Sequence, residues 1–186
     1  IAKKYGVELL VCSSLNRNSG TMVREKTKME KMLISGVAAD KNVAKIRVAG
    51  LGNDPESTFR LLNLLDRNNL NIDVMIQSLG KDGTKSVSFT VAKPDMLRTI
   101  DVLNDNKDLL GIKKLDYDEN VAKISVIGAG VRSHSGVAAK MFGALANAGI
   151  NTEMVTTSEI RITALIDEAY ADQAMRAIHE TFLERV

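Results

Sequence analysis

The sequence contains few of the residues that nucleic-acid stacking, disulfide bonding or membrane insertion require. Tryptophan is absent and aromatic residues make up 4% of the chain, so we expect no platform for stacking bases. The single cysteine, Cys12, excludes an internal disulfide and is typical of a reducing compartment. No apolar run reaches the roughly 20 residues that span a bilayer, and the net charge of +2 favours neither nucleic acid nor a membrane as partner. These absences predict a cytoplasmic protein without either partner.

Patterns typical of catalytic and metal sites are missing too. The two histidines, His134 and His179, have no cysteine or acidic cluster at metal-ligand spacing. Cys12 has no nearby activating base. Residues 128–130 (GAG) follow a predicted strand but lack the third glycine and the distal acid of a dinucleotide fingerprint. We expect no catalytic residue, no metal and no cofactor in these 186 residues.

The most informative feature that is present is a duplication. Residues 42–50 (NVAKIRVAG) recur as 120–128 (NVAKISVIG), 78 positions later and with two differences. Residues 70–73 (LNID) correspond to 150–153 (INTE), now 80 positions apart, so the second repeat carries two extra residues. A period near 80 is too long for a solenoid repeat and suits a small domain. The chain is predicted to hold two copies of one domain, and the seam between such copies is a natural place for a ligand.

Each repeat has the pattern of β-α-β-β-α. In repeat one, alternating apolar residues predict strands over 44–49, 72–76 and 87–91. Apolar residues at helical spacing predict one helix from Pro55 and a second from Pro94. A short strand over 112–117 closes repeat one, whereas repeat two ends without a corresponding strand.

A strand that could complete repeat two lies upstream of repeat one. Residues 33–38 (LISGVA) have the character of a short strand and belong to no element of repeat one. We therefore predict that this segment pairs with the sheet of repeat two, so that repeat one is inserted into repeat two. The predicted fold class is α+β, with two ferredoxin-like βαββαβ domains in tandem and antiparallel sheets that carry helices on one face.

Four stretches of the sequence resemble the bacterial aspartate kinase family. Residues 126–138 (VIGAGVRSHSGVA) resemble the VGAGMRSHPGVA segment of its regulatory region, and residues 149–160 (GINTEMVTTSEI) resemble its GINIEMISTSEI. Residues 35–42 (SGVAADKN) are similar to its TGVALDKN, and residues 1–23 look like the end of its catalytic domain. The family's regulatory region consists of tandem βαββαβ units called ACT domains, which bind amino acids. The resemblance covers nearly the whole chain.

The resemblance implies a division of the chain into four parts. Residues 1–31 would be the tail of the amino-acid kinase domain and a linker, and residues 32–40 the strand that completes the second ACT domain. Residues 41–118 would form the first ACT domain and 119–186 the second. The family's enzyme uses ATP to phosphorylate the side-chain carboxylate of L-aspartate, which gives 4-phospho-L-aspartate on the route to lysine, threonine and methionine.

The resemblance also implies a regulatory role for this chain. Lysine, threonine or both would bind to it as feedback inhibitors, and the ACT domains would form a homodimer and act on the kinase domain of the same protein. ATP and Mg would belong to that kinase domain, so these residues alone are expected to be inactive. Two alternatives stay open: a stand-alone amino-acid-sensing ACT module, and a separate regulatory small subunit that begins at an internal methionine such as Met22, Met29 or Met32.

The expected effector sites combine a helix start with an acidic strand. A helix N-terminus offers unpaired N–H groups and partial positive charge to a carboxylate, while the acids at positions 73 and 153 offer oxygens to an ammonium group. By the resemblance, the pockets form where one ACT unit meets another. The predicted effector-binding residues are Asn53, Asp54, Pro55, Thr58, Asn71, Ile72, Asp73, Gln77, Ser133, His134, Gly136, Val137, Ala138, Asn151, Thr152, Glu153, Ser158 and Glu159.

The two sites are not expected to be equivalent. The family has Pro-Gly before the first helix, and Glu56 in place of that glycine would repel an effector carboxylate. In repeat two Ser135 replaces the proline while Gly136 remains, which is a milder change. Asp73 and Glu153 could also be solvated strand charges, and Asn71 and Asn151 could simply end a helix-to-strand turn.

Overall fold

The computed structural model describes residues 9–11, 21–23, 34–129, 131 and 136–183. The chain divides into two units, residues 1–33 and 34–186. In the first unit, β1 (Leu9–Val11) pairs with β2 (Thr21–Val23) as an antiparallel ladder. The rest of the segment assigned from the sequence to a kinase-domain tail and linker lies outside the described residues.

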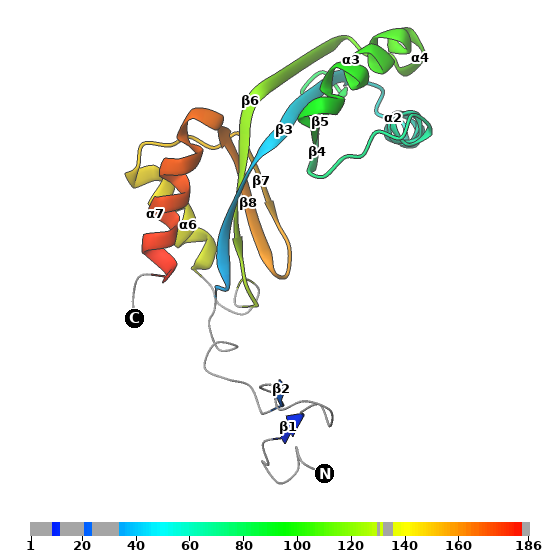
Figure 1. Cartoon of the computed structure of the whole chain (residues 1–186). Helices are drawn as coiled ribbons and strands as arrows, with labels where there is room; N and C mark the ends of the chain where they lie inside the picture. Colours follow the sequence, from blue (N-terminus) through cyan, green and yellow to red (C-terminus); the bar gives the residue numbers. More distant parts are fainter. Residues whose placement is uncertain (1–8, 12–20, 24–33, 130, 132–135, 184–186) are drawn as a thin grey trace. The chain divides into compact units, whose positions relative to one another are not determined.

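The second unit is a six-stranded antiparallel sheet with helices packed against it (Figure 1). The strand order is β4-β5-β3-β6-β8-β7. The elements of repeat one, in chain order, are β3 (Gly36–Leu51), α2 (Pro55–Arg67), β4 (Met75–Leu79), β5 (Lys85–Ala92), α3 (Met96–Asp105) and α4 (Lys107–Leu110). Then follow β6 (Lys114–Ile127), α6 (Val137–Asn147), β7 (Met154–Thr157), β8 (Arg161–Asp167) and α7 (Ala171–Leu183). The predicted fold class is confirmed.

Two long strands, β3 and β6, run through both repeats. The first part of β3 pairs with the end of β6, with Gly36 opposite Ile127 and Val37 opposite Val126. Its later part pairs with β5 on one side and with the beginning of β6 on the other. The predicted insertion of repeat one into repeat two is thus confirmed for the described part of segment 33–38. The two predicted sheets are one continuous sheet, and the short strand predicted over 112–117 is the beginning of β6.

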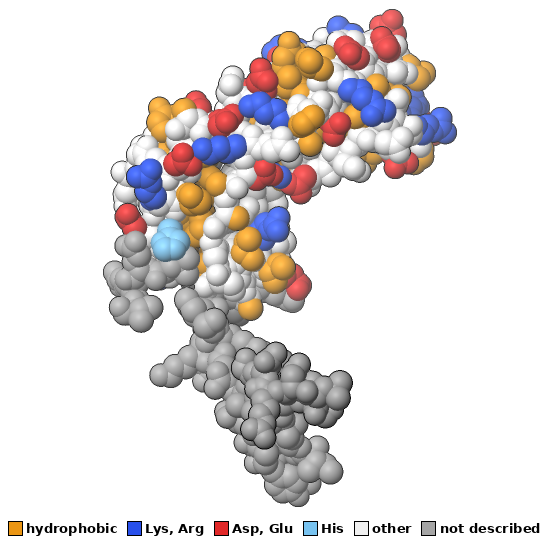
Figure 2. All heavy atoms as spheres, viewed as in Figure 1, with side chains coloured by type: hydrophobic (Ala, Val, Ile, Leu, Met, Phe, Trp, Pro, Cys, Tyr) orange, Lys and Arg blue, Asp and Glu red, His pale blue; other side chains and the backbone are white. Residues whose placement is uncertain are grey.

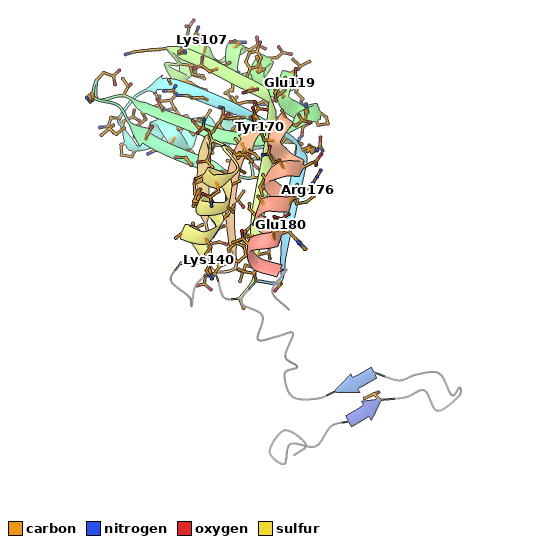
Figure 3. All side chains as sticks on the ribbon, turned by 90° about the vertical axis from the view of Figure 1, so that its left-hand side faces the viewer. Lys107, Glu119, Lys140, Tyr170, Arg176 and Glu180 are labelled. Atoms are coloured by element: carbon orange, nitrogen blue, oxygen red, sulfur yellow. The ribbon has the colours of Figure 1, made fainter. Side chains whose placement is uncertain are left out.

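Each repeat has its own core between the sheet and its helices. In repeat one, Ile46 and Phe89 on the strands pack with Leu61 of α2 and Leu103 of α3. A corresponding set in repeat two lies under α6 and α7, with Ile124, Ile162, Met141 and Ile178 among its members. In Figure 3, which looks onto α6 and α7, Lys140, Arg176 and Glu180 lie on these helices, and all three are exposed. The amphipathic helices therefore leave the sheet's other face open.

A third, smaller cluster lies on this open face where the repeats join. Val43 and Val121, which occupy equivalent repeat positions, are direct partners in the β3–β6 ladder. They pack with Val74, Met154 and Leu165. Asp40 lies opposite Lys123, and the repeat equivalents of these two residues, Asp118 and Lys45, lie opposite each other as well. Because equivalent residues meet in exchanged roles, an approximate two-fold axis passes through this point of the sheet.

Candidate effector site

The helix start of repeat one lies beside strand β4, and the acidic residue lies before the beginning of that strand. The Thr58 hydroxyl donates a hydrogen bond of 2.7 Å to Oε1 of Gln77, which joins the first turn of α2 to the middle of β4. Asp73 lies before the other end, where its N–H donates to the carbonyl of Thr90 at 3.1 Å. Four residues of extended chain span about 13 Å. Asp73 is therefore separated along the strand from Gln77, which lies beside the first turn of α2.

Repeat two has the same arrangement. The N–H of Gly128, in the loop before α6, donates to the carbonyl of Ile160 at 2.9 Å, which puts this loop beside the β7–β8 turn. At the other end of β7, the N–H of Glu153 donates to the carbonyl of Leu165 at 2.8 Å. Gly128 and Glu153 thus lie at opposite ends of β7.

The start of helix α2 is closed by a side chain of its own. Oδ1 of Asp54 accepts hydrogen bonds from the N–H groups of Glu56 at 3.0 Å and Ser57 at 2.9 Å, and the carboxylate also accepts from the Ser57 hydroxyl. The Ser57 hydroxyl, and after it the backbone N–H groups, lower the pKa of Asp54. Since an Asp side chain at the N-cap satisfies the N–H groups that would receive an effector carboxylate, repeat one offers no open helix start.

The sequence predicted that Glu56 would repel an effector carboxylate at the start of α2, but its side chain is paired within the helix. Its carboxylate accepts a hydrogen bond of 2.6 Å from Arg60, one helical turn away. The Asp54-Pro55 pair, with an N-cap acid before a proline at the first helical position, was the available indication that this helix start is self-capped. Of the predicted effector residues here, Asp54 and Pro55 thus have a structural role in α2.

The start of helix α6 is open by comparison. Gly136 occupies the N-cap position with φ 102° and ψ −11°, and among the described residues no side chain bonds to the cap. This left-handed conformation is readily available to glycine alone. Val137 is buried, whereas Ala138 in the first turn is exposed and no acidic residue accompanies it there. The predicted residues Ser133 and His134 lie outside the described residues.

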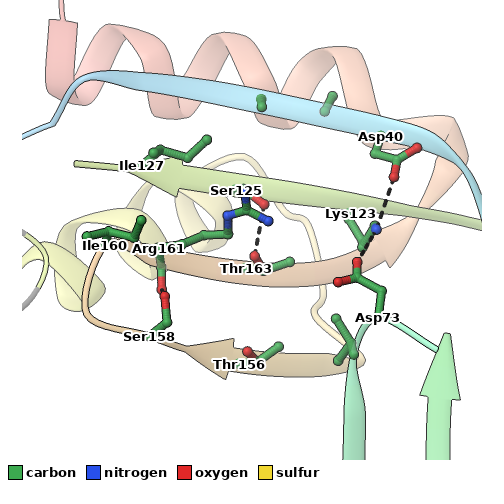
Figure 4. Close-up of a pocket in the computed structure, with 13 residues that line it drawn as sticks. Asp40, Asp73, Lys123, Ser125, Ile127, Thr156, Ser158, Ile160, Arg161 and Thr163 are labelled. Carbon is green, nitrogen blue, oxygen red and sulfur yellow. Dashed lines mark hydrogen bonds and ion pairs between the residues drawn. The ribbon is translucent and has the colours of Figure 1, made fainter. Parts of the chain in front are cut away.

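The two acids predicted to receive an ammonium group are both held by lysines. Nζ of Lys123 donates hydrogen bonds to Oδ2 of Asp73 and, at 3.0 Å, to Oδ2 of Asp40 (Figure 4). Nζ of Lys45 likewise donates to Oε2 of Glu153. Each lysine comes from one repeat and each acid from the other. Sequence reasoning missed these lysines, although they stand in the duplicated NVAKI segment that it used to find the repeats.

These contacts change the titration of Lys123 and Asp40. Burial disfavours the charged form of Lys123, but its hydrogen bonds to Asp73 and Asp40 outweigh that effect and raise its pKa. Burial likewise opposes ionisation of Asp40, while the hydrogen bonds from Lys123 and from the N–H of Asn42 lower its pKa. Lys123 and Asp40 therefore form an oppositely charged pair at neutral pH.

The remaining predicted residues lie in loops next to the edge strands β4 and β7, except Asn53, which lies between β3 and α2. Asn53, Asn71 and Asn151 are exposed, while Ile72 is half-buried and packs against the core of repeat one. Thr152 is half-buried. Ser158 and Glu159 lie in the β7–β8 turn, where the N–H of Ser158 donates to the carbonyl of Arg161 at 2.7 Å.

A cavity of about 370 Å³ lies on the open face of the sheet. The side chains of Asp40, Lys123 and Asp73 line it at one end, and Arg161 and Ile160 line it elsewhere. The Ser125 and Thr163 hydroxyls, which are 2.8 Å apart, form part of its wall (Figure 4). Neither helix start contributes to it. The cavity is therefore distinct from the carboxylate-binding half of the predicted site.

The described part of the chain contains no group of three or more His, Cys, Asp or Glu side chains arranged to hold a metal ion. No helix within it combines the length and the apolar character needed to cross a bilayer. On the face shown in Figure 2, positive and negative side chains are intermixed over the described residues.

Comparison with known proteins identifies similar chains of one kind. A model of the ACT domain matches residues 124–182. Aspartokinase from Pseudomonas aeruginosa is 36% identical over 184 residues, which are 97% of this chain and 45% of that protein. The chain thus spans about half the length of the curated relatives that it matches.

Two solved structures are similar over almost their whole length. A chain from a crystal structure of aspartokinase alpha and beta subunits is 41% identical with a TM-score of 0.75, and the match covers 80% of this chain and 98% of that one. The ligand-free regulatory subunit of aspartate kinase from Thermus thermophilus is 32% identical with a TM-score of 0.76, and the match covers 81% and 99% respectively.

Proposed function

We propose, from the premise that this chain belongs to the aspartokinase family and carries its regulatory ACT-domain region, that it binds lysine, threonine or both as feedback effectors. In the complete protein the bound effector would inhibit the ATP-dependent phosphorylation of L-aspartate. The nucleotide and Mg would belong to a kinase domain beyond the regulatory region, so residues 34–186 alone would have no kinase activity. The cytoplasm, where these amino acids are made, is the proposed location.

The open start of helix α6 carries this proposal. Its first-turn N–H groups have no side-chain cap among the described residues, and Gly136 keeps the approach free of a side chain. A Cβ at position 136 would meet nothing within 4 Å, so there is room at this point. Unpaired N–H groups and the helix dipole together favour an anion. A free amino acid supplies such an anion in its α-carboxylate.

An ammonium acceptor for the same effector would come from a second chain. Strands β4 and β7 are the two edges of the sheet, and each exposes unpaired backbone groups. Antiparallel pairing of β4 with the β7 of a second copy brings the beginning of one strand beside the end of the other. Asp73 would then lie close to the open α6 start of the other copy. Two such pairings related by a two-fold axis close a homodimer.

One related structure supports an amino acid as the effector. Escherichia coli aspartokinase III, crystallised with lysine and aspartate, shares the fold with a TM-score of 0.68 at 22% identity. A positively charged effector such as lysine would also suit the cluster of Asp40, Lys123 and Asp73, which sets two carboxyl groups against the single ammonium group of Lys123.

A second candidate function is that of a separate regulatory subunit. The near-complete coverage of the Thermus thermophilus regulatory subunit supports it. In that case the effector chemistry is the same and the kinase resides on another chain. A stand-alone sensing module without any kinase is the third possibility. Copurification of a catalytic chain from native cells would separate the second candidate from the other two.

Calorimetric titration tests the effector proposal directly. L-Lysine and L-threonine, alone and together, are titrated into the chain at millimolar concentration, with the carboxamide of each as a ligand that lacks the carboxylate. The amino acid is expected to release or absorb heat and its amide to give none. A folded protein that gives no heat with either amino acid would contradict the proposal.

One pair of variants tests the helix start itself. Ala138→Asp places a carboxylate in the first turn of α6, where it would occupy the N–H groups, and Ala138→Asn adds the same bulk without the charge. Because Ala138 is exposed, both variants are expected to fold. We expect Asp to weaken binding at least about 10-fold and Asn to change it less than about 3-fold. Equal affinities for the two variants would remove α6 from the site.

A further inference from the structure

The effector-site acids are tied to the opposite repeat in a symmetric way. Lys45 and Lys123 occupy equivalent positions of the two repeats, as do Asp73 and Glu153. Lys123 of repeat two holds Asp73 of repeat one, and Lys45 of repeat one holds Glu153 of repeat two. Because the same ion pair occurs twice, once on each side of the approximate two-fold axis, it is a feature of the junction between the repeats.

Each lysine also faces a second acid in the ladder between β3 and β6. Asp40 lies directly opposite Lys123 and pairs with it at 3.0 Å. Asp118 lies directly opposite Lys45, but within the part of the chain that the structure describes no ion pair of 4.0 Å or less joins these two. Each lysine thus has one acid on its neighbouring strand and one at the beginning of an edge strand.

Exposure shows which partner is free to change. The Lys123 side chain is 15% exposed, whereas that of Asp73 is 57% exposed. The ammonium group of an effector can therefore approach Asp73 from solvent, while Lys123 stays between the strands. When it does so, two cations compete for one carboxylate. Lys123 keeps Asp40 as a partner after it loses Asp73, so its displacement leaves no charge unpaired.

We infer that Lys123 is a positioning residue of the effector site. Without effector, Lys123 is ion-paired with both Asp73 and Asp40. When the ammonium group of an effector binds Asp73, Lys123 loses that contact and stays paired with Asp40. Asp40 never touches the effector and sets how easily Asp73 is released. The inference rests on the proposed function, since it assigns the exchange of cations that effector binding requires. By this exchange, binding at one repeat loosens a contact with the other.

Neutralising Asp40 tests the inference, because without Asp40 a displaced Lys123 has no partner. Asp40→Asn is expected to weaken binding of the amino acid about 2- to 5-fold, the range of a partly exposed ion pair. In a Lys123→Met background there is no lysine to displace, so Asp40→Asn is expected to have a much smaller effect. Lys123→Met alone is expected to tighten binding, because it removes the competing cation.

Asp116→Asn is the matched control for the loss of one negative charge on the same sheet. Asp116 is on β6 and pairs with Lys114 at 2.8 Å. It measures the general electrostatic effect on a cationic ligand, and this effect is expected to be the same in both backgrounds. Circular dichroism of every variant shows that it is folded before the titration.

The outcomes separate the two proposals. If the unaltered protein gives no heat with either amino acid, the proposed function and this inference fail together. If it binds an amino acid but Asp40→Asn is indistinguishable from Asp116→Asn, or has an equal effect with and without Lys123, the inference alone is overturned. A dependence of the Asp40→Asn effect on Lys123 supports it, since a merely structural role of Asp40 would not require that lysine.

Discussion

The continuity of β3 and β6 predicts that the two repeats unfold as one unit. Ile46 and Ile124 are equivalent repeat residues, both are 0% exposed, and each lies in the core of a different repeat. Replacing either by valine removes one buried methylene group and is expected to destabilise the protein by about 0.5–1.5 kcal/mol. For a unit of this size, about 1 kcal/mol corresponds to a fall of roughly 2–4 °C in melting temperature.

Differential scanning calorimetry measures both the size and the number of transitions. We expect one transition, with a calorimetric enthalpy equal to the van't Hoff enthalpy, and a similar downward shift for Ile46→Val and Ile124→Val. Leu97→Ala is a suitable control because Leu97 is 67% exposed on α3, and its effect is expected to stay within about 0.5 kcal/mol. Two resolved transitions, each moved by only one of the variants, would show that the shared strands do not couple the repeats.

Three further predictions concern single features. Because the pKa of Asp40 is lowered from 3.8, its ion pair adds stability above that pH and loses it as the pH falls through the lower folded value. Urea unfolding is thus expected to separate wild type from Asp40→Asn by less than about 1 kcal/mol at pH 6, and this difference is expected to shrink as the pH falls below 3.8; a difference that does not change with pH would contradict it. Asp54→Ala is expected to lower the melting temperature more than Asp54→Ser, which keeps a capping oxygen, and equal values would argue against the cap. A chain that starts at residue 42 loses the strand segment 36–40, so it is expected to lose cooperative unfolding, whereas one that starts at residue 32 keeps it; equal cooperativity would contradict the pairing with β6.

The sequence was sufficient to predict the architecture because the architecture depends on local patterns and counting. Apolar alternation located the strands, and the absence of a last strand in repeat two pointed to segment 33–38. The continuity of the sheet was not predictable in the same way. The resemblance implied a division between residues 40 and 41, yet Asp40, Lys41 and Asn42 lie within β3 at a register shift, where the N–H of Asn42 bonds to Asp40. A bulge in a strand and a turn between domains have similar local composition.

The candidate site was predictable in its parts and not in its assembly. The helix starts and the acids could be named from the sequence, but their separation along the edge strands follows from the direction of β4 and β7. The lysine contacts depend on how the repeats meet about their two-fold axis, so residues about 50 and 108 positions apart become neighbours. The periodicity of apolar residues within one segment does not show which residues of distant segments come into contact.

The self-capped start of α2 bears on stoichiometry. Asp54 occupies the start of α2, whereas no described side chain caps the start of α6, so a symmetric pair of chains would offer one α6 start from each copy. Duplication would then have produced specialised halves, one presenting amide hydrogens and the other presenting a carboxylate to the neighbouring molecule. Saturation is accordingly expected at one amino acid per polypeptide instead of two.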